Sequence, residues 1–182
     1  MKALTTILIA IVLPIMAQAQ AQIVPSVSLK TLDERTVMAP NVICADELTL
    51  VYFFNENSRD LTDNFEYLEN LAQGYGNQGK IKVIAIYNAS NGSYGQLKPF
   101  LNGNAIDLET YIDVNGELQR AMGLSASSTL LLCGSDQEFS TRYAESPDYS
   151  RELLDQQVSQ LVGDYNSQSE GDKGLIKIPG GN

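Results

Sequence analysis

The stretch LTLVYFFNENS, residues 48–58, decides the fold of this chain. Its first seven residues are apolar or β-favouring with little alternation, which indicates a strand that is covered on both faces of a sheet. The polar residues that follow are rich in helix-capping types. From Leu61 to Tyr75 apolar residues then recur at steps of three and four, which predicts an amphipathic helix that ends at Gly74 or Gly76. A buried strand followed by such a helix opens a βαβ unit.

Working outward from this unit, the pattern predicts an α/β chain with one central sheet. A hairpin is expected before it, with arms at 27–29 and 36–38 around a polar turn. After it we expect a second, parallel strand at 82–87, a short helix at 94–101 interrupted by Pro99, a brief strand at 110–113, a helical turn at 118–122, strands at 129–133 and 139–143, and a closing helix at 151–162.

The N-terminal residues indicate export. Lys2 precedes an apolar run at 3–16, and small residues follow up to Ala21, which together are typical of a cleaved secretory signal peptide. The alternative, a membrane anchor, is disfavoured because the run is shorter than the ~20 residues that cross a bilayer. We therefore predict a signal peptide at 1–21, a domain at 22–165 and a flexible tail at 166–182, in a periplasmic or secreted protein without a membrane span after cleavage.

Charge and composition exclude several classes of function. The chain has 22 acidic and 12 basic residues and a formal net charge of −10. Nucleic acids and anionic lipid surfaces are polyanions, so neither is an expected partner. Histidine is absent, which removes the commonest metal ligand and the commonest base for a serine or cysteine nucleophile. We expect no metal and no cofactor.

The order and spacing of three strings carry a family resemblance. LTLVYFFNENS at 48–58, IKVIAIY at 81–87 and YIDVNGELQRAMGLSASSTLLL at 111–132 together resemble the thioredoxin-like superfamily. The likeness is to its periplasmic thiol-disulfide oxidoreductase and peroxiredoxin-related branch, the TlpA-like proteins, and runs over residues 27–162. It implies a thioredoxin-like three-layer sandwich, a central mixed β-sheet flanked by helices.

The chain departs from that family at the residues that carry its chemistry. Active members of the family that this chain resembles have a Cys-x-x-Cys pair, and the first cysteine of the pair lies at a helix N-terminus. The matching positions here are Ser58 and Leu61, and a serine hydroxyl without a base is no nucleophile near neutral pH. The cis-proline of the family is replaced by Ser127-Ser128, for which we expect a trans peptide because a cis bond would cost about 3 kcal/mol.

Two interpretations of the former active-site loop remain open. Ser58 or Asp60 can simply be the N-cap of the helix. Alternatively, the loop is a binding site for a peptide or an anion. The residues of that candidate site are Asn57, Ser58, Arg59, Asp60, Ser127 and Ser128. No residue is predicted to be catalytic. The nearby carboxylates of Glu56, Asp60 and Asp63 match no calcium-loop spacing.

The only two cysteines, Cys44 and Cys133, are predicted to form a structural disulfide, as is usual in an oxidising compartment. In the thioredoxin arrangement both lie at the sheet edge opposite the old redox site. The leading hypothesis is a non-catalytic binding or accessory protein of the cell envelope, whose protein or peptide partner is unknown. The alternative is a divergent thiol-disulfide oxidoreductase or peroxiredoxin-like antioxidant protein that uses these two cysteines.

Overall fold

A computed structural model describes residues 22–43, 48–75, 81–90, 93–125, 127–134, 138–144, 155–156, 158–160 and 162–163. Its strands are β1 (Gln22–Ile23), β2 (Ser28–Thr31), β3 (Thr36–Met38), β4 (Thr49–Phe54), β5 (Lys82–Ala89), β6 (Thr110–Val114), β7 (Thr129–Cys133) and β8 (Glu138–Ala144). Its helices are α1 (Ala39–Val42), α2 (Leu61–Tyr75), α3 (Leu97–Gly103) and α4 (Glu117–Ala121). The strands form one mixed sheet in the order β1-β8-β7-β4-β5-β6-β2-β3.

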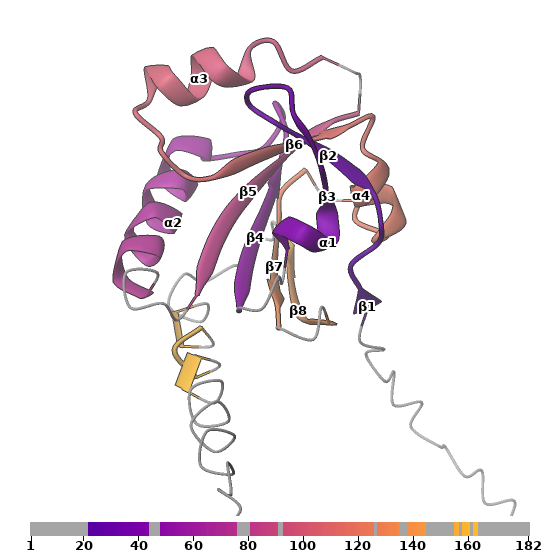
Figure 1. Ribbon diagram of the computed structural model, residues 1–182. Coiled ribbons are helices and arrows are strands. Elements are labelled where there is room, and N and C mark those ends of the chain that lie inside the picture. The colour runs from indigo at the N-terminus through magenta and orange to yellow at the C-terminus, as the bar shows by residue number, and fades with distance from the viewer. Residues whose placement is uncertain are drawn as a thin grey trace, which may run out of the picture.

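Strand β4 lies in the middle of the sheet, as its sequence predicts (Figure 1). It pairs in parallel with β5, where Val51 lies opposite Ile84, and antiparallel with β7, where Val51 lies opposite Leu131. Helix α2 makes the connection between β4 and β5, so the predicted βαβ unit is confirmed.

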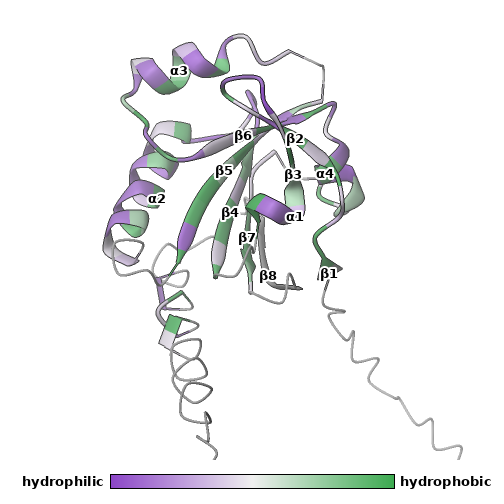
Figure 2. Ribbon diagram, in the orientation of Figure 1, coloured by the Kyte–Doolittle hydropathy of each residue, from purple (hydrophilic) through white to green (hydrophobic). Residues whose placement is uncertain are grey.

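Both faces of the sheet are covered, which explains why β4 is apolar without alternation. Leu50, Tyr52 and Phe54 pack into the cluster that includes apolar residues of α2 and α3. Val51 and Phe53 pack into a second cluster, which includes residues of α1 and α4. Apolar strands therefore form the middle layer, and the helices on either side carry mixed apolar and polar faces (Figure 2). The predicted three-layer α/β sandwich is confirmed.

Three details differ from the sequence-based expectations. Pro99 does not interrupt a helix, because α3 begins at Leu97 and places Pro99 in its first turn, where a backbone N–H has no intrahelical partner. The hairpin strand β2 also pairs antiparallel with β6. Strand β1, which was not expected, adds two residues to the edge of β8. Both additional pairings join segments that are far apart in sequence.

Several predictions fall outside the described residues. These are the signal peptide at 1–21, Cys44 and the tail at 166–182. Of the predicted closing helix, residues 155–156, 158–160 and 162–163 are described and are helical, and Val158 and Val162 join the cluster that packs under α2. Within the described part of the chain, no helix is both long and apolar enough to cross a membrane.

Candidate binding pocket

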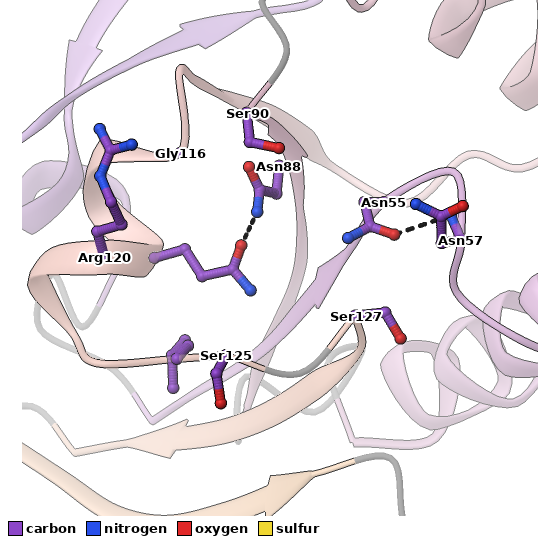
Figure 3. A pocket seen from close by; sticks show the side chains of 10 residues that line it. Asn55, Asn57, Asn88, Ser90, Gly116, Arg120, Ser125 and Ser127 are labelled. Atoms are coloured by element: carbon purple, nitrogen blue, oxygen red, sulfur yellow. Dashed lines mark hydrogen bonds between the residues drawn. The ribbon is translucent and has the colours of Figure 1, made fainter.

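A polar pocket of about 290 Å³ opens where the parallel strands β4, β5 and β6 end. In open α/β sheets this carboxyl edge is where ligands usually bind. The pocket collects side chains from four connecting segments that are far apart in sequence (Figure 3). Its lining residues are Asn55, Asn57, Asn88, Ser90, Gly116, Gln119, Arg120, Leu124, Ser125 and Ser127.

Ser58 joins the two loops on one side of the pocket. Its hydroxyl accepts the backbone N–H of Asn55 at 2.9 Å and donates to the carbonyl oxygen of Ser127 at 2.7 Å. The side-chain oxygen of Asn55 in turn accepts the backbone N–H of Asn57 at 2.8 Å. The Ser58 hydroxyl is therefore committed to the backbone as both donor and acceptor.

Asp113 organises the opposite wall. Its carboxylate is fully buried at the end of β6 and accepts the backbone N–H groups of Leu118 at 3.0 Å and Gln119 at 2.9 Å. Burial raises the pKa of Asp113, and the hydrogen bonds from the start of α4 partly counteract that shift. The intervening turn has positive φ at Asn115 and Gly116, residue types that tolerate this conformation.

Two side-chain amides meet in the pocket wall. The Asn88 amide nitrogen donates to the side-chain oxygen of Gln119, a residue that is only 5% exposed. The other atom of the Asn88 amide, Oδ1, is buried and has no hydrogen-bond partner. Gly116 makes room for it, since a Cβ at position 116 would lie 2.7 Å from Asn88 Oδ1.

Next to the pocket residue Ser127 in the chain, the Ser128 hydroxyl takes part in buried contacts that connect β4 to its neighbours. The Tyr52 hydroxyl lies 3.2 Å from that of Ser128 and accepts the amide of Asn64 from α2 at 3.3 Å. The Tyr52 ring stacks on Phe54, with 5.6 Å between their centroids. These contacts join Ser128, the sequence neighbour of the pocket residue Ser127, to the apolar core.

The loop after β4 is also held from β5. The Tyr87 hydroxyl donates to a carboxylate oxygen of Glu56 at 2.9 Å. Burial, together with this hydrogen bond to an anion, raises the pKa of Tyr87 to about 12. The phenol therefore stays protonated near neutral pH and keeps its donor role.

The structure brings only some of the six residues predicted for the binding site to the pocket. Asn57 and Ser127 line the pocket. Ser58 is the tie between loops, and Ser128 is 4% exposed and hydrogen-bonds inward. Arg59 and Asp60 are not among the lining residues; the Arg59 carbonyl accepts the Asn64 side-chain amide, and the carbonyl of Asp60, which directly precedes α2, accepts the backbone N–H of Asn64. The expected trans peptide between Ser127 and Ser128 is confirmed.

Eight lining residues were not predicted, because the candidate site was placed at the positions that match the family's redox site. They are Asn55, Asn88, Ser90, Gly116, Gln119, Arg120, Leu124 and Ser125. The sequence did contain a signal, because polar residues lie at the ends of two adjacent parallel strands. Asn55 directly follows β4, and Asn88 is the second-last residue of β5. Nothing local marks Gln119 or Arg120, because short amphipathic turns are common on any surface.

The described residues contain neither a metal-binding cluster of side chains nor a free cysteine thiol. No group of three or more His, Cys, Asp or Glu side chains within the described residues could hold a metal ion. Cys133 is fully buried at the end of β7 and is not a free thiol. It lies opposite Thr49 at the start of β4, and so at the sheet edge away from the pocket. The pairing with Cys44 stays a prediction.

The order and pairing of these elements define a thioredoxin-like α/β fold, and solved structures confirm it. A Chlorobium tepidum protein named as a thiol:disulfide interchange protein, DsbE, superposes with a TM-score of 0.67 at 15% identity, over 78% of this chain and 96% of its own. A thioredoxin-like protein of Porphyromonas gingivalis gives 0.63 at 21% identity, over 78% and 92% of the two chains. A thiol-disulfide oxidoreductase of Bacteroides fragilis gives 0.63 at 14%, over 77% and 99%.

These likenesses confirm the resemblance drawn from the sequence at the level of fold. No family model matches the chain, and no curated protein matches its sequence. The positions that would carry a Cys-x-x-Cys pair hold Ser58 and Leu61. The chain therefore has a thioredoxin-like scaffold without the catalytic dithiol, and its activity must be argued from its own residues.

Proposed function

We propose that this protein is an exported, non-catalytic binding domain of the cell envelope that holds its ligand in the polar pocket. The observation that carries the proposal is the role of Ser58. At the position where thiol chemistry needs an attacking thiolate, the chain has a hydroxyl that hydrogen-bonds the backbone of both neighbouring loops. A group held in this way supports a pocket and does not attack a disulfide.

The pocket beside Ser58 supports a binding role. Seven of its lining residues carry an amide or a hydroxyl group: Asn55, Asn57, Asn88, Gln119, Ser90, Ser125 and Ser127. Such groups orient a ligand by hydrogen bonds but have no base among them to activate a nucleophile. Export is supported by the signal-like residues 1–21 and agrees with a solved neighbour, a secreted Mycobacterium tuberculosis disulfide oxidoreductase with a TM-score of 0.60.

Turnover assays test the absence of thiol chemistry. The mature protein is expected neither to reduce insulin disulfides nor to consume peroxide above the rate of its unfolded chain, because both reactions begin with thiolate attack. The double variant Ser58→Cys/Leu61→Cys restores the Cys-x-x-Cys spacing and serves as the positive control for the assay. Activity in the wild type that disappears in Cys44→Ala would instead establish the rival function, a relocated thiol oxidoreductase.

A further inference from the structure

The charge of the pocket differs from that of the chain around it. The sequence has 22 acidic residues, yet among the described residues that line the pocket the one charged side chain is Arg120. None of the ion pairs seen among the described residues uses Arg120. The guanidinium is therefore available to an anionic group, for which its planar fork is suited when that group is a carboxylate.

The side-chain amides of Asn88 and Gln119 in the pocket wall favour a ligand group other than a carboxylate. Gln119 is 5% exposed and hydrogen-bonds the Asn88 amide, and Asn88 Oδ1 is buried without a partner. A buried acceptor without a donor costs about 1–3 kcal/mol, and such exceptions in a native fold call for an explanation. A ligand N–H group that draws the Asn88 amide toward the pocket gives this oxygen a donor. Amide side chains, which both donate and accept, are the natural partners of another amide.

Other small ligands fit the wall less well. Phosphate groups commonly bind at helix N-termini, but here the backbone N–H groups of Leu118 and Gln119 at the start of α4 are taken by the Asp113 carboxylate. The described lining has no aromatic side chain on which a sugar ring or a base could stack. A pocket of about 290 Å³ is at the small end of ligand sites.

We propose, as a deepening of the proposed function and resting on it, that the pocket binds a small molecule that carries both a carboxylate and an amide, as an N-acylated amino acid does. Arg120 lies at one end of the pocket, beside Gly116, while Asn55, Asn57 and Ser127 lie at the other (Figure 3). Arg120 binds the carboxylate, and the amides of Asn88 and Gln119 bind the amide of the ligand.

The test is an NMR titration of the mature protein with three probes. N-Acetylglycinate carries both groups, N-acetylglycinamide carries the amide without the charge, and acetate carries the charge without the amide. N-Acetylglycinate is expected to bind most tightly and to shift the amide signals of residues that line the pocket. Acetate that binds as tightly as N-acetylglycinate would overturn the proposal, because the amide contacts would then contribute nothing.

A matched pair of variants locates the site. Arg120→Gln is expected to weaken N-acetylglycinate about 10-fold, the loss of one charge-assisted contact, and to leave N-acetylglycinamide unchanged. Arg35→Gln removes the same charge at the exposed turn between β2 and β3 and is expected to change neither. Equal effects of the two variants, or signal shifts only outside the pocket, would overturn the inference.

The outcome is separable from that of the proposed function. If no probe binds while insulin reduction and peroxide consumption stay at background, the ligand class is wrong and the non-catalytic assignment stands. If the wild type turns over disulfides through Cys44, the proposed function itself fails, whatever the titration gives.

Discussion

Ser58 has a structural task at the position that matches the first cysteine of the redox proteins that this chain resembles. Its hydroxyl is the shared partner of the Asn55 N–H group and the Ser127 carbonyl, so it connects the loop after β4 to the loop before β7. A thiol at this position would be larger and a weaker hydrogen-bonding group. Serine at this position therefore connects the two loops and supplies no thiolate.

Removal of this hydroxyl is predicted to destabilise the fold. In Ser58→Ala two partly buried backbone groups lose their partner, which is expected to lower the free energy of unfolding by about 1–3 kcal/mol. Urea unfolding followed by circular dichroism measures the difference. Ser125→Ala, at an exposed lining position, is the control and is expected to change stability by less than about 0.5 kcal/mol. Equal losses in the two variants would mean that Ser58 is not a tie between loops.

Two glycines with the same backbone angle give a second test. Gly116 and Gly123 both have φ of +65°, but a Cβ at Gly116 meets Asn88 Oδ1 at 2.7 Å, whereas one at Gly123 meets nothing within 4 Å. Gly123→Ala is expected to cost about 1 kcal/mol through backbone strain. Gly116→Ala should cost about 1–2 kcal/mol more, because the Asn88 amide must move and its bond to Gln119 is lost. Thermal unfolding compares the pair, and a smaller loss at Gly116 would contradict the packing described for the pocket wall.

At the scale of elements, helix α4 is only five residues long and depends on its cap. Isolated helices of this length do not form in water, because the free energy of nucleation exceeds the stabilisation that so few hydrogen bonds provide. Asp113, at the end of β6, supplies the acceptors for its first N–H groups. The cap also sets the position of Gln119 and Arg120, so the strand end, the helix start and the pocket are coupled.

The raised pKa of Asp113 gives this cap a pH dependence. Between the unfolded pKa near 3.8 and the higher folded pKa, the folded state binds more protons, so the contribution of Asp113 to stability falls as pH rises. Asp113→Asn does not titrate and offers one acceptor oxygen in place of two. It is expected to be less stable than the wild type by about 1–3 kcal/mol at low pH, and the difference should narrow as pH rises through that interval.

Urea unfolding at a series of pH values from below 3.8 to neutral measures this difference. Asp33→Asn, at an exposed position of the hairpin turn, controls for the removal of a carboxylate and is expected to stay within about 0.5 kcal/mol of the wild type. A difference for Asp113→Asn that widens with rising pH would mean that its folded pKa lies below the unfolded value.

At the scale of the whole molecule, the proposed disulfide would link the segment before β4 to the end of β7, at the end of the sheet opposite the pocket. Ile43, the sequence neighbour of Cys44, packs in the same apolar cluster as Cys133, which supports the reach between them. Positions 44 and 133 enclose about ninety residues, for which the chain-entropy relation gives an upper figure of about 4.5 kcal/mol. Reduction is therefore expected to lower the unfolding midpoint.

Intact mass before and after reduction and alkylation measures the bond directly. We expect no alkylation without reductant and two alkylated cysteines with it. Cys44→Ala/Cys133→Ala is the control for stability and should match the reduced wild type. Two thiols that react freely in the oxidised protein would contradict the predicted pairing and would reopen a redox role for them.

The apolar run 48–54, the period of residues 61–75 and the second run at 82–87 by themselves determined the βαβ unit and the layered α/β class. They could do so because strand and helix periods are local properties, and a strand covered on both faces must be apolar throughout. The absence of the dithiol could also be predicted from the sequence, since it depends only on which residues occupy positions 58 and 61.

Only the tertiary structure decided which distant segments meet. The pairing of β2 with β6 and of β1 with β8 leaves no periodic signal, because a pairing partner is set by the whole topology. For the same reason the pocket could not be predicted from the sequence. Its residues come from four segments that converge only when β4, β5 and β6 lie side by side, and the burial of Gln119 and the close approach of Asn88 to Gly116 follow from that convergence.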